Sequence, residues 1–166
     1  MQNNTFSNLM MFSRVLMSRP FAVTNINGSK KFSNIKGTVK FFNTLNGVLV
    51  VSEINNLPSS EHICDSGVFG FHIHSGSECS GNEADEFSNA GTHYNPDGCT
   101  HPHHAGDMPP LFSNNGYAFS VFLSNRFTPN EIIGKTVIVH LMPDDFISQP
   151  SGNSGEKIAC GKIVKL

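Results

Sequence analysis

Histidines are the residues of this sequence whose type and spacing point most directly to chemistry. The chain of 166 residues contains eight of them, most between residues 72 and 104. His72 and His74 are two positions apart in a segment that alternates like a β-strand. Both rings therefore project from one face of that strand, within reach of a single ion. His140 ends a second, apolar segment, where an imidazole without a partner would be costly to bury.

A polar loop contributes further candidate ligands. Five candidate ligands lie within fifteen positions of this loop, namely His93, His101, His103, His104 and Asp107. Imidazole nitrogens and a carboxylate in tetrahedral geometry suit Zn²⁺, and imidazole also suits copper. The alternative is a flexible histidine-rich loop with only adventitious affinity for metals, but several prolines already restrict this segment. The two clusters together predict metal binding.

Short strands must position these side chains. Alternating or β-branched segments predict strands over residues 37–43, 48–54, 67–74, 116–125, 135–140 and 157–166, and the first two form a hairpin. Residues 75–115 and 142–156 are polar and lack periodicity, which is typical of long functional loops. Because no segment has a helical period, the pattern favours an all-β sandwich or barrel.

Composition excludes several classes of protein. Charged residues make up only 14% of the chain and the net charge is −2, so neither a coiled coil nor a basic nucleic-acid-binding surface is expected. No apolar run approaches the ~18–20 residues of a membrane-spanning helix. The four cysteines (Cys64, Cys79, Cys99 and Cys160) include no C-x-x-C pair and allow three pairings, among which the sequence alone does not choose.

Residues 1–34 are expected to form an N-terminal extension, poorly ordered or serving in targeting, ahead of a domain over residues 35–166. The first 52 residues contain no acidic side chain, and two arginines lie among the first 19. This composition resembles a transit peptide more than a secretory signal. Without a convincing secretory signal, we prefer a cytoplasmic location over organelle targeting or export.

Six motifs in one order carry a resemblance to a known family. They are Gly70-Phe-His-Ile-His74, His93-Tyr-Asn-Pro96 with His101, His104-Ala-Gly-Asp107, Val137-Ile-Val-His140, Gly152-Asn-Ser-Gly and Ala159-Cys-Gly161. From about residue 35 to residue 166 the chain closely resembles copper/zinc superoxide dismutases. The resemblance implies a Greek-key β-barrel of about eight antiparallel strands, copper and zinc as cofactors, superoxide as substrate and a homodimer.

The resemblance also implies a role for individual residues. The implied copper ligands are His72, His74, His93 and His140, and the implied zinc ligands are His93, His101, His104 and Asp107. His93 would bridge the two metals and take up a proton when copper is reduced. His103 does not match the family's spacing and is interpreted as a neighbour that binds no metal.

Five other residues match family positions outside the ligand set. Asp144 resembles the carboxylate that joins a copper histidine to a zinc histidine, and Cys79 and Cys160 match the intrachain disulfide. Lys157 occupies the position of the arginine that attracts superoxide to copper; lysine keeps the charge but loses the planar guanidinium. Ser151 occupies the position of the threonine that lines the substrate channel.

The resulting hypothesis is an enzyme that converts superoxide to O₂ and hydrogen peroxide by alternating reduction and reoxidation of copper, with zinc in a structural role. The competing hypothesis is a copper-binding or copper-delivery module on the same fold, without turnover. All seven ligand positions are filled, which favours the enzyme.

Overall fold

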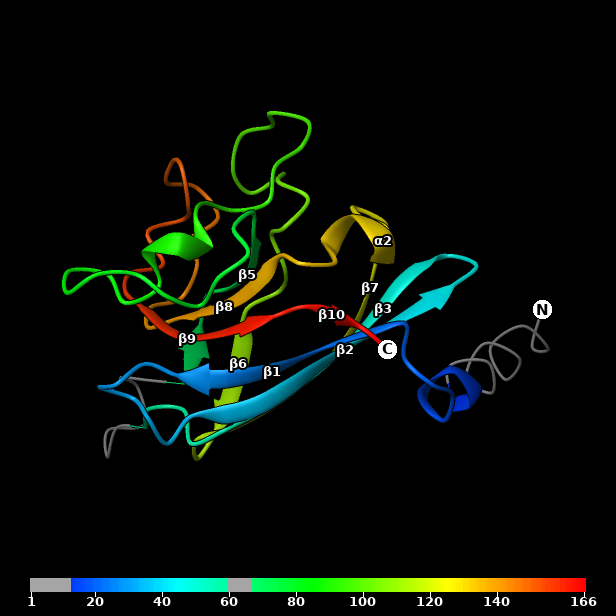
Figure 1. Cartoon of the computed structure of the whole chain (residues 1–166), viewed down its shortest axis with the longest axis horizontal. Coiled ribbons are helices and arrows are strands. Elements are labelled where there is room, and N and C mark those ends of the chain that lie inside the picture. The colour runs from blue at the N-terminus through cyan, green and yellow to red at the C-terminus, as the bar shows by residue number, and fades with distance from the viewer. Residues whose placement is uncertain (1–12, 60–66) are drawn as a thin grey trace.

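Antiparallel strands form nearly all of the regular structure in this computed structural model, which describes residues 13–59 and 67–166 (Figure 1). The strands are β1 (Ala22–Gly28), β2 (Lys36–Thr44), β3 (Gly47–Asn55), β4 (Val68–Phe69), β5 (Phe71–His74), β6 (Leu111–Asn114), β7 (Tyr117–Ser124), β8 (Thr136–His140), β9 (Lys157–Lys162) and β10 (Val164–Lys165). A 3₁₀ turn, η1 (Ser88–Ala90), lies between β5 and β6, and a short helix, α2 (Pro129–Ile132), lies between β7 and β8. Two of the ten strands are only two residues long, so the expected all-β fold of about eight strands is confirmed.

The strands follow the order β4-β6-β7-β3-β2-β1-β9-β8-β5, with β10 beside β1. Neighbours such as β3 and β7 are far apart in the chain, as Greek-key connections require. The two ends of this order, β4 and β5, are separated in sequence only by Gly70. One continuous segment therefore pairs with β6 through its first half and with β8 through its second half, which closes the sheet into a barrel.

The barrel core is formed by every second side chain of the strands, because successive side chains of a strand point to opposite faces of the sheet. In the β2–β3 hairpin, Val39 and Phe41 on one strand and Val48 and Val50 on the other are buried and belong to one hydrophobic cluster. The same cluster includes the inward side chains of β5, β8 and β9. This rigid core holds the strand ends from which the two long loops leave.

The structure differs from the sequence-based expectations in two strands. β1 lies within residues 1–34, which were expected to form an extension, yet it pairs with β2 over six residue pairs and buries Ala22, Thr24 and Ile26. β6 lies within residues 75–115, which were expected to be loop throughout. Both strands are short or rich in asparagine, so their local β-signal is weak, and pairing with longer neighbours determines their structure. Residues 1–12 and Cys64 lie outside the described residues.

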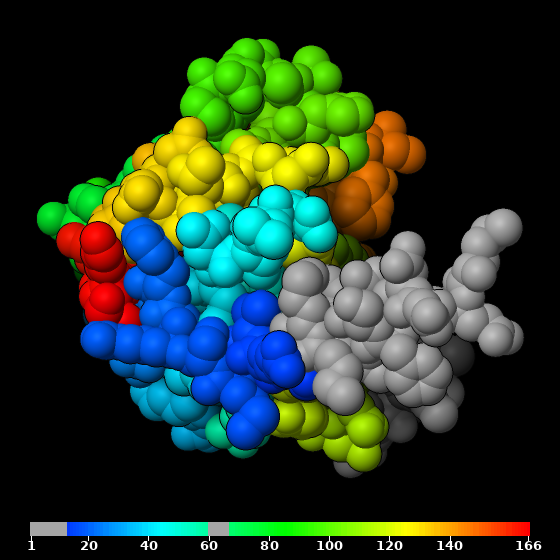
Figure 2. Space-filling view, turned by 90° about the vertical axis from the view of Figure 1, so that its right-hand side faces the viewer, coloured from blue at the N-terminus to red at the C-terminus, as the bar shows by residue number. Residues whose placement is uncertain are grey.

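Both long loops lie on the same side of the barrel, at the top left of Figure 1, where the segments coloured green and orange lie close together. In Figure 2, turned by 90°, the green segment is at the top, above the yellow surface, and the orange segment lies at the upper right. A disulfide between Cys79 and Cys160, with Cα atoms 5.6 Å apart, ties the first loop to β9 and confirms that pairing. No helix within residues 13–59 and 67–166 has the length and apolarity needed to cross a membrane.

Candidate metal centre

Two groups of side chains could each hold a metal ion. The first comprises His72, His74, His93 and His140, and the second comprises His93, His101, His104 and Asp107. Within each group the candidate ligand atoms lie within 4.8 Å of one another. His93 belongs to both groups, so the two sites are adjacent. The structure thus brings together every residue that the resemblance implied as a ligand, while His103 is exposed and belongs to neither group.

Backbone pairing around β5 brings the loop ligands to the strand ligands. Ile73, between His72 and His74, accepts a hydrogen bond from the Tyr94 N–H at 2.8 Å and donates one to the Gly106 carbonyl at 2.9 Å. A Cβ on Gly106 would lie 2.2 Å from the Ile73 carbonyl oxygen, so only glycine allows this approach. The loop segments that carry His93 and Asp107 therefore lie alongside β5 like two further short strands.

In the first group, one nitrogen of each strand histidine binds the protein and the other is left for a ligand. His74 Nδ1 lies 2.8 Å from the Gly91 carbonyl oxygen, and His140 Nδ1 lies 3.2 Å from that of Gly155. These contacts leave the two Nε2 atoms facing each other at 3.3 Å. His72 Nδ1 and His93 Nε2 are buried without any hydrogen-bond partner. A cation bound at this point would satisfy four otherwise poorly paired nitrogens.

In the second group, three Nδ1 atoms surround the carboxylate of Asp107. His93 Nδ1 lies 2.7 Å from Oδ1, and the Nδ1 atoms of His101 and His104 lie 3.1 and 3.3 Å from Oδ2. The latter two nitrogens are buried and lack a hydrogen-bond partner. Three imidazoles and one carboxylate form a donor set suited to tetrahedral zinc.

Asp144 connects the two groups. Its Oδ2 lies 2.7 Å from His72 Nε2 and its Oδ1 lies 2.8 Å from His101 Nε2, and the Phe146 N–H donates to Oδ1 at 2.7 Å. Burial of the carboxylate raises its pKa, but these hydrogen bonds together hold the pKa well below the ordinary value. The carboxylate of Asp144 therefore contacts one ring in each group.

Burial sets the protonation of the strand histidines. Desolvation by burial is the main reason that the pKa of His72 lies below its ordinary value. The same effect holds the pKa of His74 well below that value. Desolvation and the neighbouring His72 lower the pKa of His140 to about 3. At neutral pH these rings are uncharged, which is the form that binds a metal.

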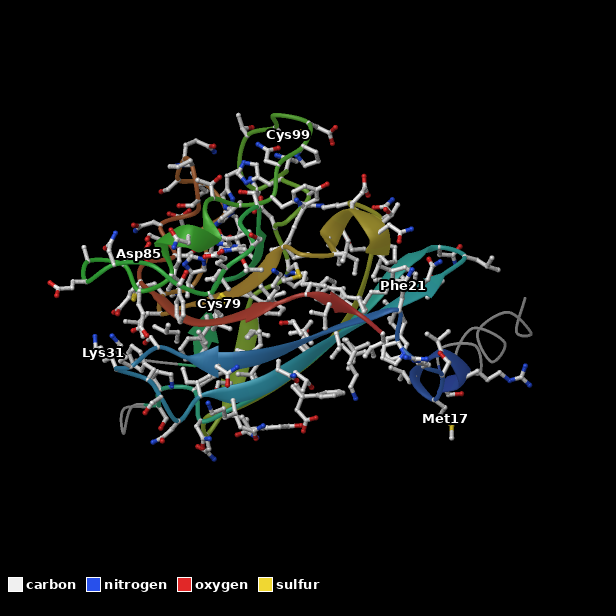
Figure 3. The ribbon with its side chains drawn as sticks, viewed as in Figure 1. Met17, Phe21, Lys31, Cys79, Asp85 and Cys99 are labelled. Atoms are coloured by element: carbon white, nitrogen blue, oxygen red, sulfur yellow. A yellow bond between two sulfur atoms is a disulfide. The ribbon has the colours of Figure 1, made fainter. Side chains whose placement is uncertain are left out.

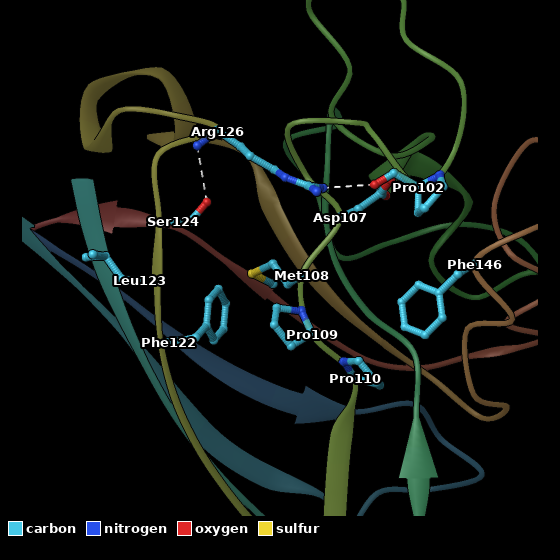
Figure 4. Close-up of a pocket in the computed structure, with 10 residues that line it drawn as sticks. All are labelled: Pro102, Asp107, Met108, Pro109, Pro110, Phe122, Leu123, Ser124, Arg126 and Phe146. Carbon is cyan, nitrogen blue, oxygen red and sulfur yellow. Dashed lines mark hydrogen bonds between the residues drawn. The ribbon is translucent and has the colours of Figure 1, made fainter. Parts of the chain in front are cut away.

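Several contacts that support the loops were not predicted from the sequence. Gln149 pairs with the backbone of His101, accepting from its N–H at 3.0 Å and donating to its carbonyl oxygen at 2.8 Å. Arg126 donates to the carbonyl oxygens of Pro102 and His104 at 2.9 and 3.4 Å. Figure 4 shows Arg126 above a hollow of about 450 Å³ between β7 and the loop, with Met108 and Phe146 on its wall. No motif marked these residues, because each acts on backbone atoms that only folding brings near.

Neither Lys157 nor Ser151 forms a described hydrogen bond to a ring of the first group. Lys157 pairs with His140 in the β8–β9 register, and its ammonium forms an ion pair with Asp85. Ser151 is half-buried, and its carbonyl oxygen accepts a hydrogen bond from the Ser154 hydroxyl. Cys99 is free and exposed at the far end of the first loop (Figure 3).

Comparison with known proteins agrees with this centre. The family model described as copper/zinc superoxide dismutase (SODC) matches residues 35–163. The chain belongs to the copper/zinc superoxide dismutase family. Two relatives of this superoxide dismutase are "Superoxide dismutase [Cu-Zn] 1" of Aquifex aeolicus, 32% identical over 142 residues, and "Superoxide dismutase [Cu-Zn]" of Legionella pneumophila, 33% identical over 136 residues. The alignments cover 76% of this chain, with 79% of the first relative and 76% of the second.

Proposed function

We propose that this chain converts two superoxide anions to O₂ and hydrogen peroxide, with copper held by the first group of ligands and zinc by the second. The observation that carries the proposal is His93, which has Nδ1 directed to Asp107 at 2.7 Å and Nε2 buried with no hydrogen-bond partner. One ring thus offers a nitrogen to each group. Copper when bound supplies the redox chemistry, because it can accept an electron from one superoxide and return it to another, whereas zinc has no redox chemistry.

His93 Nε2 is also the atom that we propose to hold a proton for the departing peroxide. The nitrogen lies inside the first group, and the opposite side of the ring is fixed by Asp107. A proton held at Nε2 therefore faces the place where the product forms. General acids act best when they are positioned in this way.

The remaining residues orient the ligands. The carbonyl oxygens of Gly91 and Gly155 accept the Nδ1 protons of His74 and His140, which fixes the tautomer that leaves Nε2 free for a metal. Asp144 does the same for His72 and His101 through their Nε2 atoms. We propose that Lys157 supplies the positive charge that draws superoxide toward the first group, and that Ser151 lines its path.

We also propose that the enzyme is a homodimer and that the outer face of β7 is its interface. Along this strand Tyr117, Phe119, Val121 and Leu123 alternate outward and are at least 40% exposed. An outward face of an antiparallel strand is usually polar. Phe112 on the neighbouring β6 extends the apolar surface and is 70% exposed. Two copies that present the same patch to each other satisfy the geometry of a two-fold dimer.

The dimer proposal predicts a change in mass. We expect light scattering on the native chain to give twice the chain mass, and Phe119→Lys to give the mass of one chain, since a charge would be buried at the interface. Lys40→Glu, an exposed change on β2, serves as the control and should stay dimeric. A monomeric native chain would refute this part of the proposal.

The catalytic proposal is tested by elemental analysis together with an activity assay. We expect one copper and one zinc per chain, and dismutation of superoxide that is lost when copper is removed. A chain that binds both metals without turnover would favour the copper-delivery alternative, and a chain that binds zinc alone would refute both.

A further inference from the structure

The cation proposed to attract superoxide is not free. Lys157 Nζ lies 2.5 Å from Asp85 Oδ2, and the two side chains are 16% and 38% exposed. Asp85 belongs to the loop that follows β5, 72 positions before Lys157 in the chain. Figure 3 labels it on the outer part of that loop, on the left of the molecule, above Lys31. This contact is therefore produced by the fold and not by sequence proximity.

The loop holds the Asp85 carboxylate in place. The Phe87 N–H donates to Oδ1 at 3.0 Å, which leaves Oδ2 for Lys157. The backbone carbonyl of Asp85 accepts from the N–H groups of Asn82 and Ser88 at 3.0 and 3.1 Å. A Cβ on Gly81 would lie 2.2 Å from that carbonyl oxygen, so the turn is closely packed. Burial raises the pKa of Asp85, but the bonds from Lys157 and Phe87 lower it below its ordinary value, and the pair is charged at neutral pH.

The surroundings of the pair carry no excess of positive charge. A hollow of about 480 Å³ is lined by three lysines and four carboxylates, Lys30, Lys31, Lys157, Glu83, Asp85, Glu86 and Glu156. Lys31 pairs with Glu156 at 3.3 Å, and the Lys30 N–H donates to Glu86. Gly155, whose carbonyl binds His140, also lines this hollow, so it adjoins the first ligand group.

We propose that Asp85 masks the charge of Lys157 and thereby limits how fast this enzyme captures superoxide. This inference rests on the proposed function. An isolated ammonium attracts an anion over about a Debye length, roughly 8–10 Å at physiological salt, whereas a contact ion pair has no net charge and its field falls off faster. Superoxide must also displace or bypass the carboxylate to reach the ammonium. Asp85 is a positioning residue whose effect is exerted through Lys157.

The test compares the native chain with Asp85→Asn, which removes the charge but keeps an oxygen for the Phe87 N–H. With copper and zinc bound, we expect the rate constant for superoxide at low salt to rise about two- to fivefold and to depend more steeply on ionic strength. The charges of a whole protein can raise the association rate of a charged substrate by about 10–10³-fold, and a single unmasked charge should contribute a small part of such an effect. Glu83→Gln is the matched control. It removes one negative charge from the same hollow, and the described contacts of Glu83 include none to Lys157.

A second readout does not depend on copper. Inorganic phosphate is titrated into the metal-free protein and the amide resonance of Lys157 is followed by NMR. We expect Asp85→Asn to bind phosphate about two- to fivefold more tightly than the native chain, and Asp85→Asn combined with Lys157→Met to lose the gain. Asp85→Ser is a second variant in case the first does not fold.

Each outcome decides the proposal. A rate that is unchanged or lower in both Asp85 variants, or a gain of the same size in Glu83→Gln, would overturn the masking role. A native chain that is inactive with both metals bound would refute the proposed function. In that case the phosphate titration would still test whether Asp85 masks Lys157.

Discussion

Gly152 packs directly against the carboxylate of Asp144. A Cβ added to Gly152 would lie 2.0 Å from Asp144 Oδ1 and 2.6 Å from His101 Nε2, so the space that any other side chain needs is already occupied. The φ angle of Gly152 is +67°, in a region that favours glycine. The second loop thus reaches the two metal-ligand groups through a backbone position that only glycine fits.

We expect Gly152→Ala to weaken zinc retention by roughly tenfold, because the new methyl group would push Asp144 away from His101. Competition with a chelator measures the change. Gly134→Ala is the control: Gly134 also has a positive φ, +83°, but its added Cβ would meet nothing within 4 Å. Equal losses in the two variants would mean that backbone strain, and not the contact with Asp144, explains the effect.

Asp144→Asn is expected to weaken retention of both metals by about 10–100-fold. An amide can accept from only one of the two rings, so either His72 or His101 loses its charged partner. Asp145→Asn should retain both metals, because Asp145 is exposed and the described hydrogen bonds of its carboxylate go to Ile147 and Ser148 in its own loop. Dialysis against a chelator followed by elemental analysis separates the two outcomes, and similar losses would refute the orienting role of Asp144.

The metal ligands could be predicted because residue type and spacing along the chain indicate which side chains can bind one ion. His72 and His74 are two positions apart on a strand. His104 and Asp107 are three positions apart in a loop, and Asp107 pairs with His72 on that strand. Strong alternation likewise predicted the β2–β3 hairpin. Gly70 is a more subtle case, since the single strand expected over residues 67–74 divides there into β4 and β5, which pair with different neighbours.

Contacts that depend on the fold could not be predicted in this way. Asp85 reaches Lys157 only because the loop after β5 folds back along β9, where the disulfide holds it. Arg126 donates hydrogen bonds to the backbone carbonyl oxygens of Pro102 and His104. Because every residue has a backbone carbonyl, the sequence does not indicate which ones an arginine will contact. In β1 the buried alternation was present, but its asparagines favour turns, so pairing with β2 decided its structure.

The metal-free protein should lose stability on acidification. In the folded chain the pKa of His140 lies at about 3, below its ordinary value of 6.5. Between these values the unfolded chain binds more protons, so the free energy of unfolding falls as the pH drops below 6.5. For His140 alone the loss at pH 5 is about 2 kcal/mol, and His72 and His74 act in the same direction.

Thermal unfolding of the metal-free chain from pH 7.5 to 5.0 checks this expectation. We expect the melting temperature to fall, and His140→Gln to flatten the profile, since it removes one of the titrating rings. His103→Gln is the control and should leave the profile unchanged, because His103 is exposed. A native profile that is flat over this range would show that burial does not lower the pKa of these rings in the folded chain.

Lys157 offers a separate test of how superoxide reaches the first ligand group. Lys157→Arg keeps the charge, and its guanidinium can bind Asp85 through one nitrogen while its other N–H groups remain for superoxide, so its rate should equal or exceed that of the native chain. Lys157→Ala leaves Asp85 unpaired, which replaces a neutral pair with a net negative charge beside His140. We expect this variant to react about fivefold more slowly at low salt and to speed up, relative to the native chain, as salt screens the repulsion.

Copper content should be unchanged in all Lys157 variants, because Lys157 belongs to neither ligand group. Lys162→Ala removes the same charge from an exposed position on the same strand and should leave the rate nearly unchanged. If Lys157→Ala kept the native rate and salt dependence, Lys157 would have no part in drawing superoxide to the site.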